Sequence, residues 1–336
     1  MESYGRMIDY LRVSVTDRCN LRCVYCMPPG GIEKLNSDEL LKYEDIVRII
    51  EAGADLGLKK IRFTGGEPLV RKGFVNLVKK TREIGAITDI SITTNGILLD
   101  AFAASLKEAG LDRVNISLDT LNEKKFEKIT RGGDLNKVFE GIKAAQEVGL
   151  SPVKINVVVI RGFNDEEVSD FIDYGRREEL EIRFIEYMPI GESTDTDWKQ
   201  SYVSVDEIKS QCSSYGEMFE TSTSNGNGPA KYYDFKDSKG KIGFISAVSE
   251  HFCESCNRLR LTSDGKIKNC LFSDKEFDIM PSLDYKEKIK ETFKKSVQNK
   301  PKEHIINSDQ GAASKNKGEG NDKENGNGRN MIQIGG

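Results

Sequence analysis

Apolar and polar positions follow two rhythms over the first 190 residues of the chain. Short apolar stretches typical of strands lie at residues 8–15, 60–64, 89–93, 114–118, 153–160 and 182–185. Between them, apolar residues recur at helical spacing in residues 43–56, 73–84, 98–109 and 135–148. Asn164 precedes three acidic residues and therefore predicts the N-cap of one more helix.

Strands that alternate with helices at this spacing predict an α/β fold with a parallel sheet. The repeated units can form a doubly wound sheet or an incomplete barrel, and periodicity alone does not decide between the two. In either architecture, ligands bind where the parallel strands end. A cysteine-rich loop, the turn Gly65-Gly66, Thr93-Thr94 and Ser117 stand at or just after predicted strands. We therefore expect them to share one face of the protein.

The pattern changes after residue 189. Residues 191–235 are polar without renewed alternation, whereas residues 285–298 predict an amphipathic helix. Residues 307–328 carry no large apolar residue and predict disorder, but apolar residues return in the final segment RNMIQIGG. We divide the chain accordingly into residues 1–210, 211–300, 301–328 and 329–336.

Composition narrows the classes of function. The 336 residues carry 50 Lys and Arg against 54 Asp and Glu, a formal net charge of only −4. This balance provides no overall positive field for nucleic acid, so any bound anion must meet a local cluster of charge. No apolar run approaches the roughly 20 residues that span a bilayer, and the first residues do not form a secretory signal. We expect a cytoplasmic protein without a nucleic-acid or membrane partner.

The cysteines point to metal chemistry. Six of the seven fall into two groups, Cys19-x3-Cys23-x2-Cys26 and Cys253-x2-Cys256-x13-Cys270. Three thiolates can hold three irons of a [4Fe–4S] cluster and leave the fourth iron open to an outside ligand. A zinc knuckle would need a fourth ligand, and no histidine lies near the first group. For the second group, the spacing is compatible with three interpretations. It could be a structural zinc site with Cys212 or His251 as the fourth ligand, a generic auxiliary iron–sulfur cluster, or a second [4Fe–4S] cluster with an open iron.

The first group and its surroundings resemble a known superfamily. Cys19-Asn-Leu-Arg-Cys23-Val-Tyr25-Cys26 is similar to the CxxxCx(aromatic)C signature of radical S-adenosylmethionine (SAM) enzymes, and Gly65-Gly66-Glu67-Pro68 resembles their GGEP turn. The resemblance implies an incomplete (β/α)6 barrel. It also implies that a reduced [4Fe–4S] cluster cleaves SAM to a 5′-deoxyadenosyl radical, which then removes a hydrogen from the substrate.

Further segments resemble one branch of that superfamily, the GTP 3′,8-cyclases of molybdenum cofactor biosynthesis. They are LRVSVTDRCNLRCVYCMP at 11–28, IRFTGGEPLVR at 61–71, ITTNG at 92–96, NISLDTL at 115–121, IEYMP at 185–189, CNRLRL at 256–261, CLF at 270–272 and the final Gly-Gly. The chain departs from the branch in its polar insert before the tail and in residues 278–284, where the family usually carries arginines.

What this resemblance implies is specific. The enzyme would be a lyase that converts GTP to (8S)-3′,8-cyclo-7,8-dihydroguanosine 5′-triphosphate, using two [4Fe–4S] clusters and SAM. The second cluster would lie in a C-terminal extension that closes the barrel, and its open iron would hold guanine. A one-electron reductant of unknown identity would supply electrons, and the next pathway enzyme, cyclic pyranopterin monophosphate synthase, would take the product. The enzyme would be a monomer or homodimer.

Residue roles follow position by position from the same resemblance. The residues that would bind GTP are Arg12, Arg62, Thr93, Lys154, Arg258, Leu259 and Arg260, and those that would contact SAM are Tyr25, Gly66, Ser117 and Met188. The fixed fork of arginine suits phosphate oxygens. Gly335 and Gly336 would enter the active site, because two residues without side chains fit a crowded pocket. Two alternatives are a radical SAM peptide-modifying enzyme with an auxiliary cluster and a non-catalytic metal-binding or electron-transfer protein.

Overall fold

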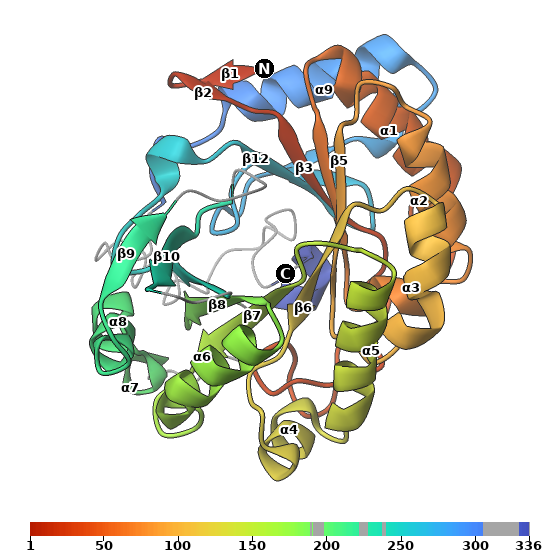
Figure 1. Cartoon of the computed structure of the whole chain (residues 1–336). Helices are drawn as coiled ribbons and strands as arrows, with labels where there is room; N and C mark the ends of the chain where they lie inside the picture. Colours follow the sequence, from red (N-terminus) through yellow and green to blue (C-terminus); the bar gives the residue numbers. More distant parts are fainter. Residues whose placement is uncertain (189, 191–197, 222–227, 237–239, 305–328, 336) are drawn as a thin grey trace.

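A curved sheet of twelve strands forms the centre of the molecule (Figure 1). The computed structural model describes residues 1–188, 190, 198–221, 228–236, 240–304 and 329–335. Six parallel strands stand side by side in chain order: β3 (Tyr10–Ser14), β4 (Lys60–Thr64), β5 (Asp89–Thr94), β6 (Arg113–Ser117), β7 (Lys154–Val159) and β8 (Glu181–Glu186). They coincide with the six predicted strands to within a few residues at each end. The expected parallel, incomplete barrel is confirmed.

Helices cover the outer face of these strands (Figure 1). They are α1 (Tyr43–Asp55), α2 (Phe74–Arg82), α3 (Leu99–Glu108), α4 (Glu123–Thr130), α5 (Leu135–Glu147) and α6 (Val168–Arg177). The sequence pattern did not predict α4, whose N-terminus is capped by the side chain of Asn122. As predicted, a helical segment begins directly after Asn164, since the 3-10 turn Asp165–Glu167 leads into α6. The side chain of Asn164, however, makes no capping hydrogen bond. It instead accepts from the Ile160 amide and donates to the carbonyls of Asp119 and Val158, so it ties two strand ends together.

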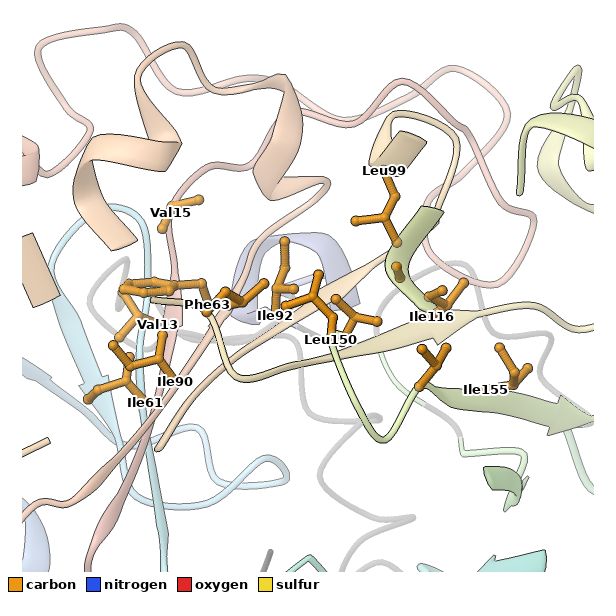
Figure 2. Close-up of a cluster of buried hydrophobic side chains, with 14 of the residues drawn as sticks. Val13, Val15, Ile61, Phe63, Ile90, Ile92, Leu99, Ile116, Leu150 and Ile155 are labelled. Atoms are coloured by element: carbon orange, nitrogen blue, oxygen red, sulfur yellow. The ribbon is translucent and has the colours of Figure 1, made fainter. Parts of the chain in front are cut away.

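Strand alternation separates an apolar core from a polar interior. On β3, Leu11 and Val13 are fully buried against the helices, whereas Tyr10 and Arg12 line a central cavity. The other parallel strands repeat this division because successive side chains point to opposite faces. Figure 2 shows the outer side: neighbouring strands contribute Val13, Phe63, Ile92, Ile116 and Ile155 to one continuous apolar cluster. The core thus lies outside the barrel wall and leaves its interior free for chemistry.

The C-terminal part extends the sheet at both edges. Beside β8 lie β11 (Lys241–Ile245), β10 (Lys231–Phe235) and β9 (Met218–Thr221); beside β3 lie β12 (Arg258–Leu261), β13 (Lys266–Lys268) and β14 (Glu276–Asp278). The expectation that alternation ends at residue 189 is wrong, since α8 (Val205–Ser213) packs on α6 and β11 joins β8 in parallel. The polar surface of α8 hid it, because only Val205, Ile208 and Cys212 are buried. The division at residue 210 stays a prediction.

Shorter elements complete the structure. A hairpin of β1 (Glu2–Ser3) and β2 (Arg6–Met7) precedes the barrel, and α7 (Trp198–Ser201) precedes α8. The predicted amphipathic helix is present as α9 (Lys286–Gln298), which packs on α1. The predicted disordered segment, residues 307–328, lies outside the described residues. Beyond it, α11 (Met331–Ile334) brings the end of the chain inside the ring of strands (Figure 1). Among the helices that the structure describes, none is long and apolar enough to cross a membrane.

Candidate active site

One cavity of about 310 Å³ lies inside the barrel, where the strands end. All six cysteines of the two groups line it, as do residues from most strands and from the C-terminal tail. Segments more than 200 residues apart in the chain therefore meet at a single site. This confirms the expectation that the loops after the strands share one face.

The first cysteine group occupies the loop after β3. Cys19, Cys23 and Cys26 are all partly buried, and the Cys26 amide donates to the Cys23 carbonyl at 3.0 Å. Burial raises the pKa of Cys19 to about 12. A hydrogen bond with Cys26, together with burial, raises the pKa of Cys23 well above its usual value. No cation among the described residues stabilises either thiolate, so a metal that bound here would have to displace the two thiol protons.

The GGEP turn packs tightly against this loop. A Cβ at Gly66 would stand 2.4 Å from the Arg18 carbonyl oxygen and 2.9 Å from Cγ1 of Ile332, so only glycine fits. Glu67 is fully buried and accepts from the amide of Asn95 at 2.7 Å and the hydroxyl of Thr94 at 2.8 Å. Burial raises the pKa of Glu67 to about 7. Its side chain therefore ties the turn to the end of β5.

The residues expected to contact SAM belong to the lining of the same cavity. Tyr25, Gly66, Ser117 and Met188 all line it. The Tyr25 hydroxyl donates to the carboxylate of Asp119, which also accepts from the Val158 amide at 2.9 Å. Burial raises the pKa of Asp119 to about 6. Sequence reasoning had given Asp119 no role, although it stands two residues after Ser117 in the quoted motif.

The second cysteine group has a more positive environment. The buried Lys300 ammonium donates to the carbonyls of Arg258 (3.0 Å) and Asn269 (2.5 Å) and also hydrogen-bonds the Cys256 thiol. Burial by itself would raise the pKa of Cys256, but the nearby charges of Arg258 and Lys300 lower it to about 6. From the N-terminal hairpin, Arg6 donates to the Cys253 carbonyl at 2.9 Å. Burial raises the pKa of Cys253, so among these cysteines it is Cys256 whose surroundings favour the thiolate.

The donor set suits iron–sulfur clusters. Each group brings three thiols to the cavity wall. Within the described ranges, no three His, Cys, Asp or Glu side chains gather closely enough to hold a single metal ion. A [4Fe–4S] cluster that is bound by three cysteines takes one thiolate on each of three irons, so the donor set of each group matches one such cluster.

Guanidinium groups line the wall between the two cysteine groups. Arg12, Arg62, Arg258 and Arg260 all face the cavity, and none of them pairs with a carboxylate within the part of the chain that the structure describes. Burial, together with the charge of neighbouring Arg260, lowers the pKa of Arg12 to about 9. Burial likewise lowers the pKa of Arg62 to about 9. Buried cations without counter-ions are costly, so this wall favours an anionic ligand.

Orphaned polar atoms on the same wall point to a hydrogen-bonding ligand. The Thr93 hydroxyl and Nε of Arg12 are buried and have no hydrogen-bond partner among the described residues, whereas the Tyr10 hydroxyl interacts with the Arg12 guanidinium group alone. Burial by itself would raise the pKa of Tyr10, but the guanidinium groups of Arg62, Arg12 and Arg258 lower it below its usual value. Buried polar groups are normally satisfied, so these atoms mark where a ligand would bind.

Comparison with known proteins agrees with this geometry. Residues 13–175 match the Radical SAM superfamily, and residues 180–306 match the family described as Molybdenum Cofactor Synthesis C. A GTP 3′,8-cyclase from Listeria welshimeri is 49% identical over 304 residues, covering 90% of this chain and 91% of the relative. One from Clostridium botulinum (strain Langeland) is 45% identical over 336 residues and covers 100% of both chains. The chain belongs to the GTP 3′,8-cyclase family.

Solved structures of more distant proteins share the fold of this family member. Streptococcus suis SuiB bound to S-adenosylmethionine superposes with a TM-score of 0.60 at 16% identity, covering 83% of this chain and 64% of SuiB. Native anSMEcpe with bound AdoMet gives a TM-score of 0.57 at 16% identity, covering 85% of this chain and 83% of that one. At such identity the likeness concerns the fold alone.

Some predicted site residues lie away from the cavity wall. Lys154 is fully buried in an ion pair with Glu181 at 2.5 Å and near the hydroxyl of Tyr232, so its assignment to GTP stays a prediction. The side chain of Leu259 packs in the core outside the barrel, which leaves only its backbone toward the interior. The Gly335 carbonyl accepts from Nη1 of Arg260. Gly336 lies outside the described residues.

Sequence reasoning missed four cations that line the cavity: Lys60 and Arg113, which pair with Asp9 and Asp89, and also Arg183 and Lys300. Arg183 on β8 lines the cavity and donates to the hydroxyl of Tyr232 at 2.6 Å and to Oδ1 of Asn115 at 2.9 Å. The sequence could have indicated Arg183, because this arginine follows an isoleucine on a predicted strand just as Arg62 does. Lys300 gave no comparable signal, because it follows a surface helix and is one of 50 basic residues.

Proposed function

We propose that this protein cyclises GTP to (8S)-3′,8-cyclo-7,8-dihydroguanosine 5′-triphosphate by radical SAM chemistry, as the first step of molybdenum cofactor biosynthesis. One observation carries the proposal. Two three-cysteine groups open onto a single cavity whose intervening wall holds buried guanidinium groups without carboxylate partners in the described ranges. An anionic nucleotide bound there would lie between a cluster that serves SAM and a cluster that faces the substrate.

The cysteines divide between the two cofactor sites. Cys19, Cys23 and Cys26 would hold the first [4Fe–4S] cluster, and Tyr25, Gly66, Ser117 and Met188 would contact SAM beside it. When bound and reduced, that cluster would supply the electron for cleavage of SAM, and the resulting 5′-deoxyadenosyl radical would remove hydrogen from ribose C3′. Cys253, Cys256 and Cys270 would hold the second cluster beside the guanine base.

The chain's own residues hold the substrate in place. Arg12, Arg258 and Arg260 would bind the triphosphate, since their guanidinium groups offer several donors in fixed directions. Arg62 and the orphaned hydroxyl of Thr93 would add contacts on the neighbouring strands. Lys154 and the backbone of Leu259 complete the predicted GTP set. Such positioning matters because the C3′ radical must be held against C8 of guanine before it reacts elsewhere.

The tail closes the same cavity. Met331 and Ile332 line it, and Ile332 lies against Gly66. The Gly335 carbonyl accepts from Arg260, one of the arginines assigned to the triphosphate. These contacts support an active-site role for Gly335, which would orient a substrate-binding arginine and help to exclude water from the radical, whereas the role of Gly336 stays a prediction from the sequence.

A product assay tests the proposal. The reconstituted protein is incubated anaerobically with GTP, SAM and dithionite, and the products are identified by mass spectrometry. We expect 5′-deoxyadenosine and the cyclic nucleotide to accumulate together, with neither cyclic product nor coupled turnover when ATP replaces GTP. Cleavage of SAM that never yields a cyclised guanosine triphosphate would refute it. The alternative of a peptide-modifying enzyme has no comparable support, since the relatives at 45–49% identity are GTP 3′,8-cyclases.

Other expectations stay predictions from the sequence. They are a one-electron reductant, delivery of the product to cyclic pyranopterin monophosphate synthase, a cytoplasmic location and a monomeric or homodimeric state. Sedimentation of the purified protein, with and without GTP, would decide the last of these.

A further inference from the structure

The tail is attached to the protein by an ion-pair cluster at its first described residue. Arg329 donates from Nη1 and Nη2 to the two oxygens of Asp264, at 3.1 and 2.8 Å. Its Nη2 and Nε lie 2.9 and 2.8 Å from the two oxygens of Glu276. The three side chains are 20%, 18% and 13% exposed. We call Arg329, Asp264 and Glu276 the Arg329 clamp.

The clamp has a rigid support. Asp264 stands in the turn between β12 and β13, where the Gly265 amide donates to Thr262 and the Gly265 carbonyl accepts from Ile279. Glu276 begins β14 and also pairs with the nearly buried Lys268 at 3.3 Å. Arginine in a forked contact with two carboxylates has little freedom to change direction. The clamp therefore defines both the position and the direction in which the tail starts.

The same hairpin holds the tail at its other end. Arg260 of β12 lies four residues before Asp264 and donates to the Gly335 carbonyl. Residues 329 and 335 thus attach to one hairpin at two points. Between them, Asn330 and Gln333 form a reciprocal capping box, and Ile332 and Ile334 are 5% and 3% exposed. The segment is short and internally bonded, so the first attachment sets the register of the second.

We propose that Arg329, paired with Asp264 and Glu276, is a positioning residue that places Gly335 against Arg260 and commits the tail to the active-site cavity. The inference rests on the proposed function, because the tail matters only if the cavity cyclises GTP. Arg329 itself lies outside the set of cavity-lining residues. It acts through the register of the tail rather than by touching the substrate.

Neutralising the clamp should uncouple the tail without disturbing the fold. Ion pairs at this degree of exposure contribute a free energy between that of exposed pairs and that of buried charge-assisted pairs. We therefore expect Arg329→Gln to lower both the docked fraction of the tail and the cyclisation rate about tenfold. The matched control is Arg48→Gln, which removes an exposed arginine that pairs with Asp45 on α1. The control should cyclise GTP at the wild-type rate.

Three measurements separate positioning from stability. Hydrogen exchange of the Gln333 amide, which donates to Asn330 at 2.9 Å, should become faster in Arg329→Gln. Iron content, SAM affinity and melting temperature should match the wild type. In an Asp264→Asn/Glu276→Gln background, Arg329→Gln should cause no further loss, because the interaction is already absent.

The outcomes decide the matter in either direction. Wild-type cyclisation by Arg329→Gln would overturn the proposal, and so would a loss of activity accompanied by equal losses of iron and melting temperature. An additive loss in the triple variant would overturn it as well. If the wild-type protein makes no cyclic product, the proposed function fails, and the exchange rate of the tail then decides the clamp separately.

Discussion

Replacing Gly335 with alanine tests whether the tail must pack closely against β3 and β4. Gly335 has φ of +69°, and a Cβ there would lie 2.3 Å from Oγ1 of Thr64 and 3.1 Å from Cβ of Ser14. The left-handed conformation alone costs an L-residue about 1–2 kcal/mol, which lowers the docked population by a factor of about 5–30. The overlap with Thr64 adds to this, so the Gly335 carbonyl should leave Arg260.

We therefore expect Gly335→Ala to lose at least about tenfold in cyclisation under single-turnover conditions. Iron content and melting temperature should stay at wild-type values, because the substitution touches only the end of the chain. The matched control is Gly85→Ala, since no atom lies within 4 Å of a Cβ built there and its φ is not in the left-handed region. A Gly335→Ala protein that makes the cyclic product at the wild-type rate would refute the reasoning.

Three further predictions concern the cysteines and Arg258, one of the arginines proposed to bind the triphosphate. Cys23→Ala should remove one cluster and abolish SAM cleavage, whereas Cys256→Ala should remove the other cluster and leave some SAM cleavage without product. A Cys256→Ala protein with full iron content and full product formation would contradict a second cluster that faces the substrate. Arg258→Ala should weaken GTP binding about ten- to a hundredfold, because a charge-assisted contact contributes about 1.5–3 kcal/mol, and equal weakening of SAM binding by calorimetry would indicate a structural role instead. In the metal-free protein, the lowered pKa of Cys256, about 6, makes it mainly thiolate at pH 7, whereas the pKa of Cys19, raised to about 12, keeps it protonated. Iodoacetamide at pH 7 should therefore label Cys256 first, with labelling that slows below about pH 6, and equal labelling of the two thiols would contradict the assignment.

Local patterns predicted the barrel and the cofactor loop well. The six parallel strands follow from apolar runs of a few residues, and each lies within a few positions of its expected place. The spacing of Cys19, Cys23 and Cys26 and the turn at Gly66 are also local, since neighbouring residues in the chain carry the whole signal. The polar helix α8 was missed because only three of its residues are buried and solvent covers the rest.

Pairings between distant segments could not be predicted in the same way. Leu259 matches a substrate-binding motif, yet the period of two along β12 turns its side chain into the core while Arg258 and Arg260 face the cavity. Lys154 lies on a predicted strand, but burial beside Glu181 gives it an internal partner. The partners of such a side chain depend on which strands pair with its own strand, and a single sequence does not specify that pairing.

The amino-acid sequence alone was enough to indicate the six parallel strands, most of the helices between them, the two cysteine groups and the glycines of the tight turn, because these features depend on neighbouring residues. The tertiary structure decided how they meet. It brought Lys300 to Cys256, Gly335 to Arg260 and Arg329 to Asp264. Each of these contacts joins residues more than 40 positions apart, and its strength arises only when folding removes both partners from water.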